Sequence, residues 1–382
     1  MTTVLVTGGA GFIGSHTVDL LLARGYRVRI LDALLPPVHR GGQPPDYLPA
    51  DAELLVGDVR DRAALRRALE GVELVVHLAA YQDYLTDFSR FFDVNATGTA
   101  LLYELIVNER LPVRKVVVAS SQAVYGEGKY RCPRDGVQYP PLRPESQLRA
   151  GQWEVRCPAC GRPMQLCPTD EAVVNPHNQY AMSKHAQEMI ALNLGQRYGI
   201  PTVALRYSIT QGPRQSFRNA YSGICRIFVT RLLAGRAPVA YEDGRQLRDY
   251  VSVEDVARAN LLALEDPRAD YQAFNVGGGQ AVSVLEYAAL AAEVLGVDIP
   301  VQVPGEYRFG DTRHIVSDIG KLQALGWQPQ TSLRQIIADY AEWASRQPDL
   351  QDYSERAEQV MKAVGAVRRA AVLPAPAGSR LC

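Results

Sequence analysis

Short apolar runs rich in β-branched residues alternate with amphipathic helical patterns along the first half of the chain. Runs of this kind are typical of strands that are buried on both faces of a parallel sheet. They lie at residues 3–7, 27–31, 53–56, 74–80, 115–119 and 202–207. Because such strands alternate with helices, we predict an α/β fold, a Rossmann-type doubly wound parallel sheet with a smaller C-terminal substrate-binding lobe.

The pattern also divides the chain into parts. A segment rich in proline and polar residues interrupts the alternation after residue 130, and the alternation ends after about residue 212. The predicted parts are a sheet domain of residues 1–130 and 177–212, a cysteine-containing insert of 131–176, a lobe of 213–345 whose chain crosses back near 251–275, and an extension of 346–382. Within the extension we expect a helix in residues 352–371 and a flexible end in 373–382.

Three glycines stand between the first predicted strand and the first helical pattern. Gly8 permits a tight turn, Gly11 lets the backbone approach a pyrophosphate, and Gly14 lets the helix pack close to the strand. Phe12 and Ile13 complete this loop, and the helix N-terminus that follows supplies N–H groups and a partial positive charge for phosphates. The order of strand, glycine turn and helix therefore predicts a dinucleotide-binding site.

Asp32 ends the second predicted strand. An acidic side chain there accepts hydrogen bonds from the ribose hydroxyls and repels a 2′-phosphate, so the expected cofactor is NAD rather than NADP. His77, inside the fourth strand, is predicted to be packed rather than catalytic. The other predicted cofactor contacts follow the third and fourth strands: Asp58 and Val59 against the adenine, and Leu78, Ala79 and Ala80 beneath the cofactor.

Three residues predict the reaction chemistry. Ser121 follows the fifth strand, at the edge of the sheet where ligands of such folds bind. Tyr180 and Lys184 lie four residues apart on a predicted helix, so they share one face of it. A nearby ammonium group and a positive nicotinamide ring both favour the phenolate, which lowers the pKa of the tyrosine from about 10. We predict that Tyr180 is the acid–base group of a hydride transfer, that Ser121 holds the substrate hydroxyl, and that Lys184 also binds the cofactor.

These motifs resemble those of the extended short-chain dehydrogenases/reductases, in the NAD-dependent nucleotide-sugar epimerase/dehydratase family. The resemblance covers roughly residues 2–345 and implies that Asn95 and Tyr180 also contact the cofactor. Within the family the pattern is most similar to the dTDP-L-rhamnose 4-epimerases and then to the UDP-sugar 4-epimerases. The matching stretches are residues 6–16, 77–80, 94–99, 120–126, 180–184, 248–257, 274–277, 310–313 and 325–329.

The resemblance also narrows the reaction. The 4,6-dehydratases of the family have Asp-Glu directly after the catalytic Ser or Thr, whereas this chain has Gln122 and Ala123. With neither an acid nor a thiol there, the expected reaction is oxidation and re-reduction at one carbon, which is 4-epimerisation and makes the protein an isomerase. A dehydratase or a net 4-keto-sugar oxidoreductase on the same fold is the alternative, because a base could come from another loop.

Two arginines, Arg248 and Arg313, match family positions that clamp the substrate diphosphate, for which the guanidinium fork is well suited. Ser121 and Gln122 complete the predicted substrate contacts. Many relatives have asparagine where this chain has Ile209, and an isoleucine cannot replace the hydrogen bonds of an amide. The position or identity of the sugar is therefore expected to differ from that in these relatives.

Four of the six cysteines fall inside the insert. Cys157 and Cys160 form a knuckle across a tight turn, and Cys132 and Cys167 are near in sequence. Four thiolates are the number that a structural zinc takes, so we predict a zinc ion that pins the insert over the mouth of the active site. The alternative is incidental free thiols.

Charge and hydropathy restrict the partners. The 382 residues carry 41 basic and 41 acidic side chains, so no strong field favours nucleic acid or a membrane surface. The first strand starts at residue 3 and no run of about twenty apolar residues occurs, so neither a signal peptide nor a membrane span is expected. With free or metal-bound cysteines, we expect a cytoplasmic protein. The family resemblance implies a homodimer formed by the helices near residues 95–109 and 180–198.

Overall fold

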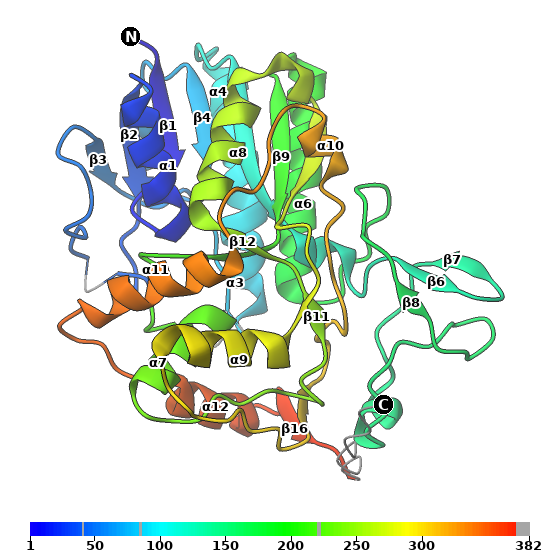
Figure 1. The fold of residues 1–382 in the computed structure, drawn as a ribbon. Helices are drawn as coiled ribbons and strands as arrows, with labels where there is room; N and C mark the ends of the chain where they lie inside the picture. Colours follow the sequence, from blue (N-terminus) through cyan, green and yellow to red (C-terminus); the bar gives the residue numbers. More distant parts are fainter. Residues whose placement is uncertain (40–41, 84–85, 220–222, 372–382) are drawn as a thin grey trace.

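The computed structural model describes residues 1–39, 42–83, 86–219 and 223–371. Its main feature is a seven-stranded sheet in which every neighbouring pair of strands is parallel (Figure 1). Sheets of this kind are buried on both faces, and β1, β4, β9 and most of β5 are buried throughout. In order across the sheet the strands are β13 (Gln272–Val276), β9 (Thr202–Tyr207), β5 (Lys115–Ser121), β4 (Leu74–His77), β1 (Thr3–Thr7), β2 (Arg27–Asp32) and β3 (Glu53–Val56).

Helices cover both faces of this sheet, each over its own apolar cluster. One cluster joins the sheet to α1 (Phe12–Ala23) and α8 (Val253–Glu265), which pack against each other. The second joins it to α2 (Arg62–Leu69), α4 (Gly98–Asn108) and α6 (Gln179–Tyr198). The expected doubly wound α/β architecture is confirmed. Smaller elements of this layer are α3 (Phe88–Phe92), a π-helical turn (Asp93–Thr97), 3₁₀ turns (Gln122–Tyr125 and Pro267–Ala269) and α10 (Gly320–Gln323).

A smaller lobe lies below the carboxyl ends of the strands (Figure 1). Its core is a third apolar cluster built from α7 (Ile224–Leu233), α9 (Val284–Leu295) and α11 (Leu333–Ser345). β10 (Ile209–Gln211), which follows β9, connects it to the sheet domain by pairing with β12 (Tyr250–Ser252), and β11 (Leu247–Arg248) pairs with β14 (Val282–Ser283) within the lobe. The lobe therefore faces the edge of the sheet at which ligands bind.

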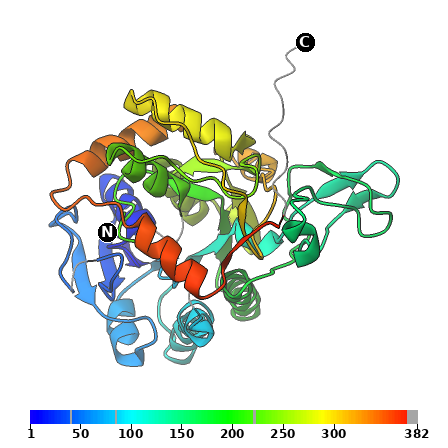
Figure 2. The same ribbon diagram turned by 90° about the horizontal axis from the view of Figure 1, so that it is seen from below.

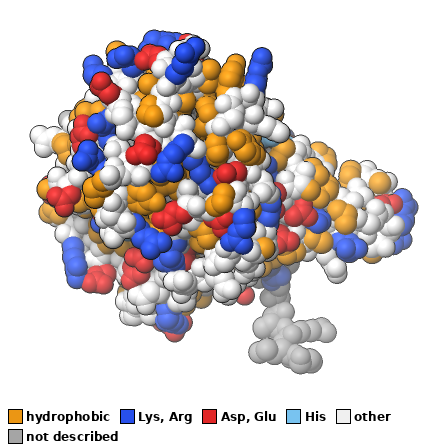
Figure 3. Space-filling model, turned by 90° about the horizontal axis from the view of Figure 1, so that it is seen from above, with side chains coloured by type: hydrophobic (Ala, Val, Ile, Leu, Met, Phe, Trp, Pro, Cys, Tyr) orange, Lys and Arg blue, Asp and Glu red, His pale blue; other side chains and the backbone are white. Residues whose placement is uncertain are grey.

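The cysteine-containing insert projects sideways from this body (Figures 1 and 3). It holds a three-stranded antiparallel sheet of β6 (Tyr130–Cys132), β7 (Gly136–Gln138) and β8 (Gln165–Leu166), and the short helix α5 (Glu145–Arg149). On the face shown in Figure 3, basic and acidic side chains are interspersed. In the described part of the chain no helix is long and apolar enough to cross a bilayer.

The extension after residue 345 is only partly helical. Helix α12 (Ser354–Ala363) ends well before residue 371, and β16 (Val367–Arg369) pairs antiparallel with β15 (Glu306–Arg308) of the lobe. The expectation of one helix within residues 352–371 was thus too simple, because the chain leaves the helix at Gly365 with a positive φ and continues as a strand. Residues 373–382, expected to be flexible, lie outside the described residues.

Candidate active site

One cavity of about 870 Å³ runs from the carboxyl ends of the sheet strands into the smaller lobe. This volume lies in the range of known ligand and cofactor sites. The sheet domain contributes the glycine loop, the ends of β2, β4 and β5, and the start of α6, whereas the lobe contributes α7 and its loops. The cavity therefore has a sheet-domain end and a lobe end, with Ser121 and Tyr180 among the residues of its wall.

The glycine loop is closed to side chains. A Cβ on Gly14 would lie 2.1 Å from the carbonyl oxygen of Gly8, and one on Gly8, whose φ is +69°, would lie 2.8 Å from the backbone nitrogen of Ala79. Gly8, Gly11, Phe12, Ile13 and Gly14 all line the cavity. Gly11 is the N-cap of α1 and makes no side-chain hydrogen bond, so the side chain of the cap covers none of the N–H groups at the start of this helix.

Acidic residues flank the cavity where β2 and β3 end. Asp32 accepts hydrogen bonds from the backbone N–H groups of Ala10, at 3.0 Å, and Leu34, at 2.9 Å, and His39 lies 3.6 Å from it. Asp58 is paired with Arg60 at 2.7 Å, and this hydrogen bond lowers the pKa of the Asp58 carboxyl. The structure brings both acids to the wall of the cavity, together with the other predicted contacts Val59, Leu78, Ala79 and Ala80.

Ser121, Tyr180 and Lys184 all line the same cavity. Ser121 ends β5, and its hydroxyl accepts a hydrogen bond from the N–H of Ala123 at 3.1 Å. Tyr180 and Lys184 lie in the first turns of α6, whose N-cap is Asn178. Burial raises the pKa of Tyr180 to about 12, against a lowering by its hydrogen bond with Ser121. Tyr180 and Ser121 thus lie near each other on the cavity wall.

Lys184 is 1 % exposed. Burial lowers the pKa of its ammonium to about 7, while the charge of Glu188 raises it. The ammonium donates a hydrogen bond to Gln187. Glu188 is held in turn by Arg206, 2.5 Å away, and by the hydroxyl of Ser120 at 2.8 Å. The lysine therefore lies next to the buried ion pair of Glu188 and Arg206. This ion pair fixes the same face of α6 against β5 and β9.

His77 and Asn95 make hydrogen bonds that connect the segments around the site. Both ring nitrogens of His77 are bonded to threonine hydroxyls, of Thr7 at 2.7 Å and Thr99 at 3.0 Å, and burial lowers its pKa to about 3. Asn95 is fully buried and bonds the backbone N–H and C=O of Tyr81 and the hydroxyl of Ser183. His77 is thus packed, and Asn95 joins the loop after β4 to α6, while its contact with the cofactor stays a prediction.

The lobe end of the cavity is rich in guanidinium groups. Arg248, a predicted substrate contact, lines it and donates to the carbonyl oxygens of Thr312 and Arg313. Arg226 and Arg231 on α7 and Arg308 on β15 line it as well. Sequence reasoning missed these three residues. The spacing of two arginines on one helix was visible, but no pattern told that α7 turns them toward this cavity.

The structure does not bring Arg313 to the cavity. Its side chain is fully buried and its guanidinium contacts three carboxylates: Glu154 at 2.6 Å, Glu242 at 2.9 Å and Asp243 at 2.7 Å. Glu154 belongs to the insert, so the direction in which the Arg313 side chain points depends on a segment far away in sequence. Neighbouring Gly310, Asp311 and Thr312 do line the cavity.

Several polar atoms of the cavity wall are buried and have no hydrogen-bond partner among the described residues. Because leaving such an atom unpaired costs roughly 1–3 kcal/mol, its presence in a native structure indicates a bound polar ligand or water. Gln122, predicted to touch the substrate, is one of them. The full set is Oε1 of Gln122, Oε1 of Gln215, Oδ1 of Asn219, Oε1 of Gln246 and the hydroxyl of Tyr250.

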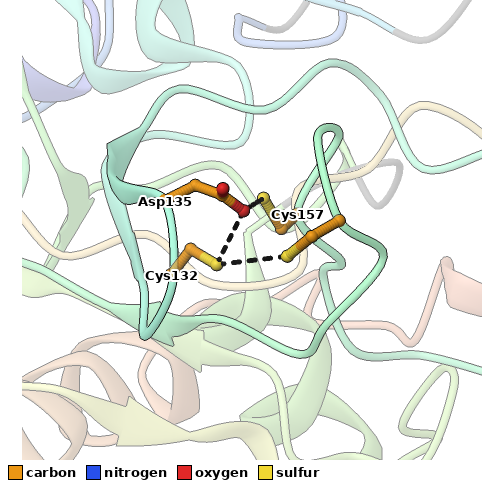
Figure 4. A group of neighbouring side chains, drawn as sticks. Cys132, Asp135 and Cys157 are labelled. Atoms are coloured by element: carbon orange, nitrogen blue, oxygen red, sulfur yellow. Dashed lines mark hydrogen bonds between the residues drawn. The ribbon is translucent and has the colours of Figure 1, made fainter.

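The cysteine cluster differs from the predicted set by one member. Cys132, Cys157, Cys160 and Asp135 place their ligand atoms within 4.8 Å of one another (Figure 4). The Sγ atoms of Cys132 and Cys160 are 3.5 Å apart, and Asp135 lies 3.2 Å from the Sγ of Cys157. Within the described chain Cys167 is not part of this group; its N–H bonds the carbonyl of Lys129. Asp135 takes the fourth place because the β6–β7 turn returns it beside Cys132.

Comparisons with known proteins agree with this geometry. A model of the NAD dependent epimerase/dehydratase family matches residues 4–148 and 158–277. The chain is 36 % identical over 352 residues to dTDP-L-rhamnose 4-epimerase of Burkholderia thailandensis, covering 91 % of this chain and 96 % of that protein. Among solved structures, UDP-glucose 4-epimerase of Thermotoga maritima with UDP-glucose has a TM-score of 0.72 at 29 % identity, over 90 % of this chain and 99 % of that one. UDP-glucose 4-epimerase of Thermus thermophilus in complex with NAD has a TM-score of 0.69 at 32 % identity, over 90 % and 98 %.

The lowered pKa of Lys184 makes the stability of the dinucleotide-free protein depend on pH. Between about pH 7 and pH 10.5 the unfolded chain holds this proton and the folded one releases it, so stability rises with pH. We expect the free energy of unfolding of the wild type, relative to that of Lys184→Met, to increase as the pH rises from 7 to 10. The increase should be at most about 1.4 kcal/mol per pH unit. Urea denaturation across this range measures it.

The control for this measurement is Lys362→Met. The pKa of Lys362 is raised by its hydrogen bonds to Glu358 and Glu306, so its proton stays bound in both states over the same range. The difference between wild type and this variant should therefore stay constant between pH 7 and 10. A constant difference for Lys184→Met as well would show that the ammonium is not destabilised by burial.

Proposed function

Because the chain belongs to the NAD dependent epimerase/dehydratase family, we infer that it is an NAD-dependent nucleotide-sugar 4-epimerase and therefore an isomerase. The observation that carries this inference is that Ser121, Tyr180 and Lys184 line one cavity together with the glycine loop. The side chains after Ser121 are Gln122 and Ala123, which offer neither an acid nor a thiol for chemistry at a second carbon.

The sheet-domain end of the cavity fits NAD. Backbone N–H groups at the start of α1 suit the pyrophosphate, and Gly11 leaves room for its close approach. Asp32, beside the loop, is placed for the ribose hydroxyls and against a 2′-phosphate. Bound NAD supplies an acceptor for the hydride of the sugar carbon C4 and a donor that returns it.

The protein's own groups handle the proton. Ser121 holds the C4 hydroxyl by a hydrogen bond, and Tyr180 takes the hydroxyl proton and later gives it back. Tyr180 needs a positive neighbour for this, because burial alone keeps its phenol protonated. Lys184, one helical turn away, is that neighbour when it carries a proton. Epimerisation then requires only that the sugar present its other face before the hydride returns.

The substrate is a dTDP- or UDP-linked hexose, and the epimerised product is a building block for carbohydrate biosynthesis. Support for dTDP-L-rhamnose comes from the relative that acts on it and is 36 % identical. Arginines at the lobe end suit a diphosphate, with Arg248 joined by Arg226, Arg231 and Arg308 in place of Arg313. Ile209 lines the cavity as well, so an apolar side chain faces the ligand where many relatives have an amide.

We further propose a structural zinc in the insert, held by Cys132, Cys157, Cys160 and Asp135. Three thiolates and a carboxylate match the number and type of ligands that Zn²⁺ takes. Cys157 of this cluster follows closely after Glu154 in the chain. The ion would therefore hold in place the segment whose Glu154 pairs with Arg313. Free cysteines in the insert also fit a reducing compartment such as the cytoplasm.

We also propose a homodimer that buries exposed apolar side chains on α3 and α6, two helices that pack against each other. Phe88 and Phe92 on α3 are 54 % and 38 % exposed, and Met182 and Met189 on α6 are 44 % and 47 % exposed. The family resemblance implies that a second copy of this chain packs on α6 and on the helix near residues 95–109, and we extend this interface to α3, which packs against α6. Large apolar side chains gathered on one face mark an interaction site.

The activity is tested by proton NMR of the protein with dTDP-L-rhamnose and a panel of other dTDP- and UDP-sugars. A new anomeric signal from the C4 epimer, without net absorbance at 340 nm, is the expected result. Tyr180→Phe should lower kcat by about 10²- to 10⁴-fold, the usual contribution of acid–base catalysis. Tyr198→Phe, exposed at the far end of the same helix, is the control. Accumulation of a keto sugar or of NADH would instead identify a dehydratase or an oxidoreductase.

Metal analysis of the purified protein should find about one zinc per chain, as one group of four ligands implies. Cys160→Ser should lose the ion, whereas Cys167→Ser should keep it, because Cys167 lies outside the group. Equal zinc content in both variants would contradict the ligand set, and well under one zinc per chain in the wild type would contradict the site.

Light scattering at micromolar concentration should show a dimer. Met189→Glu should shift it toward monomer, because a carboxylate buried in an apolar interface is left without a partner. Val137→Glu, an equally exposed position on the insert, should leave the dimer intact. A monomeric wild type would rule out the proposal.

A further inference from the structure

The C-terminal segment of the chain builds part of the cavity wall. Four of its residues, Ser354, Glu358 and Met361 on α12 and Ala366 just before β16, line the same cavity as the glycine loop and Tyr180. Met361 is 5 % exposed, and the helix lies across the smaller lobe when the molecule is seen from below (Figure 2). A segment that follows the last helix of the lobe core thus becomes part of the site.

Ionic and backbone contacts hold this segment in place. The guanidinium of Arg231, itself on the cavity wall, donates to the hydroxyl of Ser354 at 2.9 Å. Lys362 pairs with Glu306 at 2.9 Å, next to the β15–β16 strand pair. At its end the segment reaches the insert, where Arg368 lies 2.7 Å from Glu145. It is therefore fixed to the lobe at one end and to the insert at the other.

The neighbours of Glu358 show which part of the cavity it borders. Tyr241 lines the same cavity as Glu358. The guanidinium of Arg308 lies 5.0 Å from the centre of the Tyr241 ring, and Arg308 also pairs with Asp311 at 2.8 Å. This region combines an aromatic ring, a guanidinium and a carboxylate at the lobe end, away from the glycine loop.

The order of the parts in a nucleotide sugar indicates which part lies beside Tyr241 and α12. The reacting sugar must reach Ser121 and Tyr180, and the arginines of the lobe end suit the diphosphate. The remaining part of the ligand is the nucleoside, which must continue past these arginines toward Tyr241 and α12. A flexible methionine packs well on a flat base, and a carboxylate can accept hydrogen bonds from a ribose hydroxyl or a base N–H.

We propose, on the basis of the function inferred above, that α12 completes the nucleoside subsite. Met361 packs against the nucleoside, and Glu358 accepts a hydrogen bond from it. Glu358 already accepts from Lys362 at 2.7 Å, but a carboxylate has lone pairs for further donors. The C-terminal extension is thus a determinant of nucleotide affinity.

Calorimetric titration of the full-length protein with UDP and with dTDP tests this. Met361→Ala and Glu358→Gln should each weaken binding on the order of tenfold, the effect of one lost buried contact or charged hydrogen bond. With the full nucleotide sugar, KM should rise by a similar factor while kcat changes little, because the sugar end of the ligand is untouched. Val364→Ala and Glu355→Gln, exposed on or next to the same helix, are the matched controls.

Each outcome has a distinct meaning. Unchanged nucleotide affinity in Met361→Ala and Glu358→Gln, in protein that still epimerises its substrate, would overturn the proposal and leave the function standing. Weakened binding in a protein without epimerase activity would support the subsite and overturn the function. If neither nucleotide binds the wild type, both fail. Titrations are run well below the unfolding temperature that each variant shows without nucleotide, which separates lost contacts from lost folding.

Discussion

Two buried guanidinium groups join the sheet domain, the insert and the smaller lobe. Arg143 of the insert pairs with Glu127, at 3.0 Å, and with Glu242 of the lobe, at 2.8 Å. Arg313 shares Glu242 and reaches back to Glu154 of the insert. Removing one partner from such a cluster leaves an uncompensated buried charge, at a cost of about 3–5 kcal/mol. The insert is therefore a structural part of the lobe. The ion pairs of this cluster form only when all three parts are folded together.

The reaction centre shows the opposite arrangement. Lys184 is as deeply buried as Arg313, but the carboxylate nearest to it, Glu188, is shared with Arg206 and Ser120. Its charge is thus poorly compensated, which is why burial lowers its pKa to about 7. The buried guanidinium groups of Arg143 and Arg313 are thus paired with carboxylates. Lys184, at the reaction centre, is left able to change its charge near neutral pH.

The sheet domain and its chemistry could be predicted because they depend on local spacing. The glycine loop follows directly from one strand–turn–helix unit, and Tyr180 and Lys184 share a face whatever else the chain does. Arg313 could not be predicted in this way, because three carboxylates from other segments decide where it points. Asp135 was missed for a similar reason: a carboxylate in a turn carries no metal signal until the fold brings thiols around it.

The same distinction explains why the cofactor is easier to identify than the sugar. The NAD side of the cavity is built from the ends of regularly alternating strands and helices, which the sequence pattern predicts, whereas the substrate side is assembled from β10, α7, β15 and α12, which follow no such pattern. The apolar cluster of Leu148, Trp153, Tyr307 and Ala370 joins the insert, the lobe and the C-terminal segment at one point. Residues from segments far apart in the sequence therefore shape the substrate side together, and no single motif predicts it.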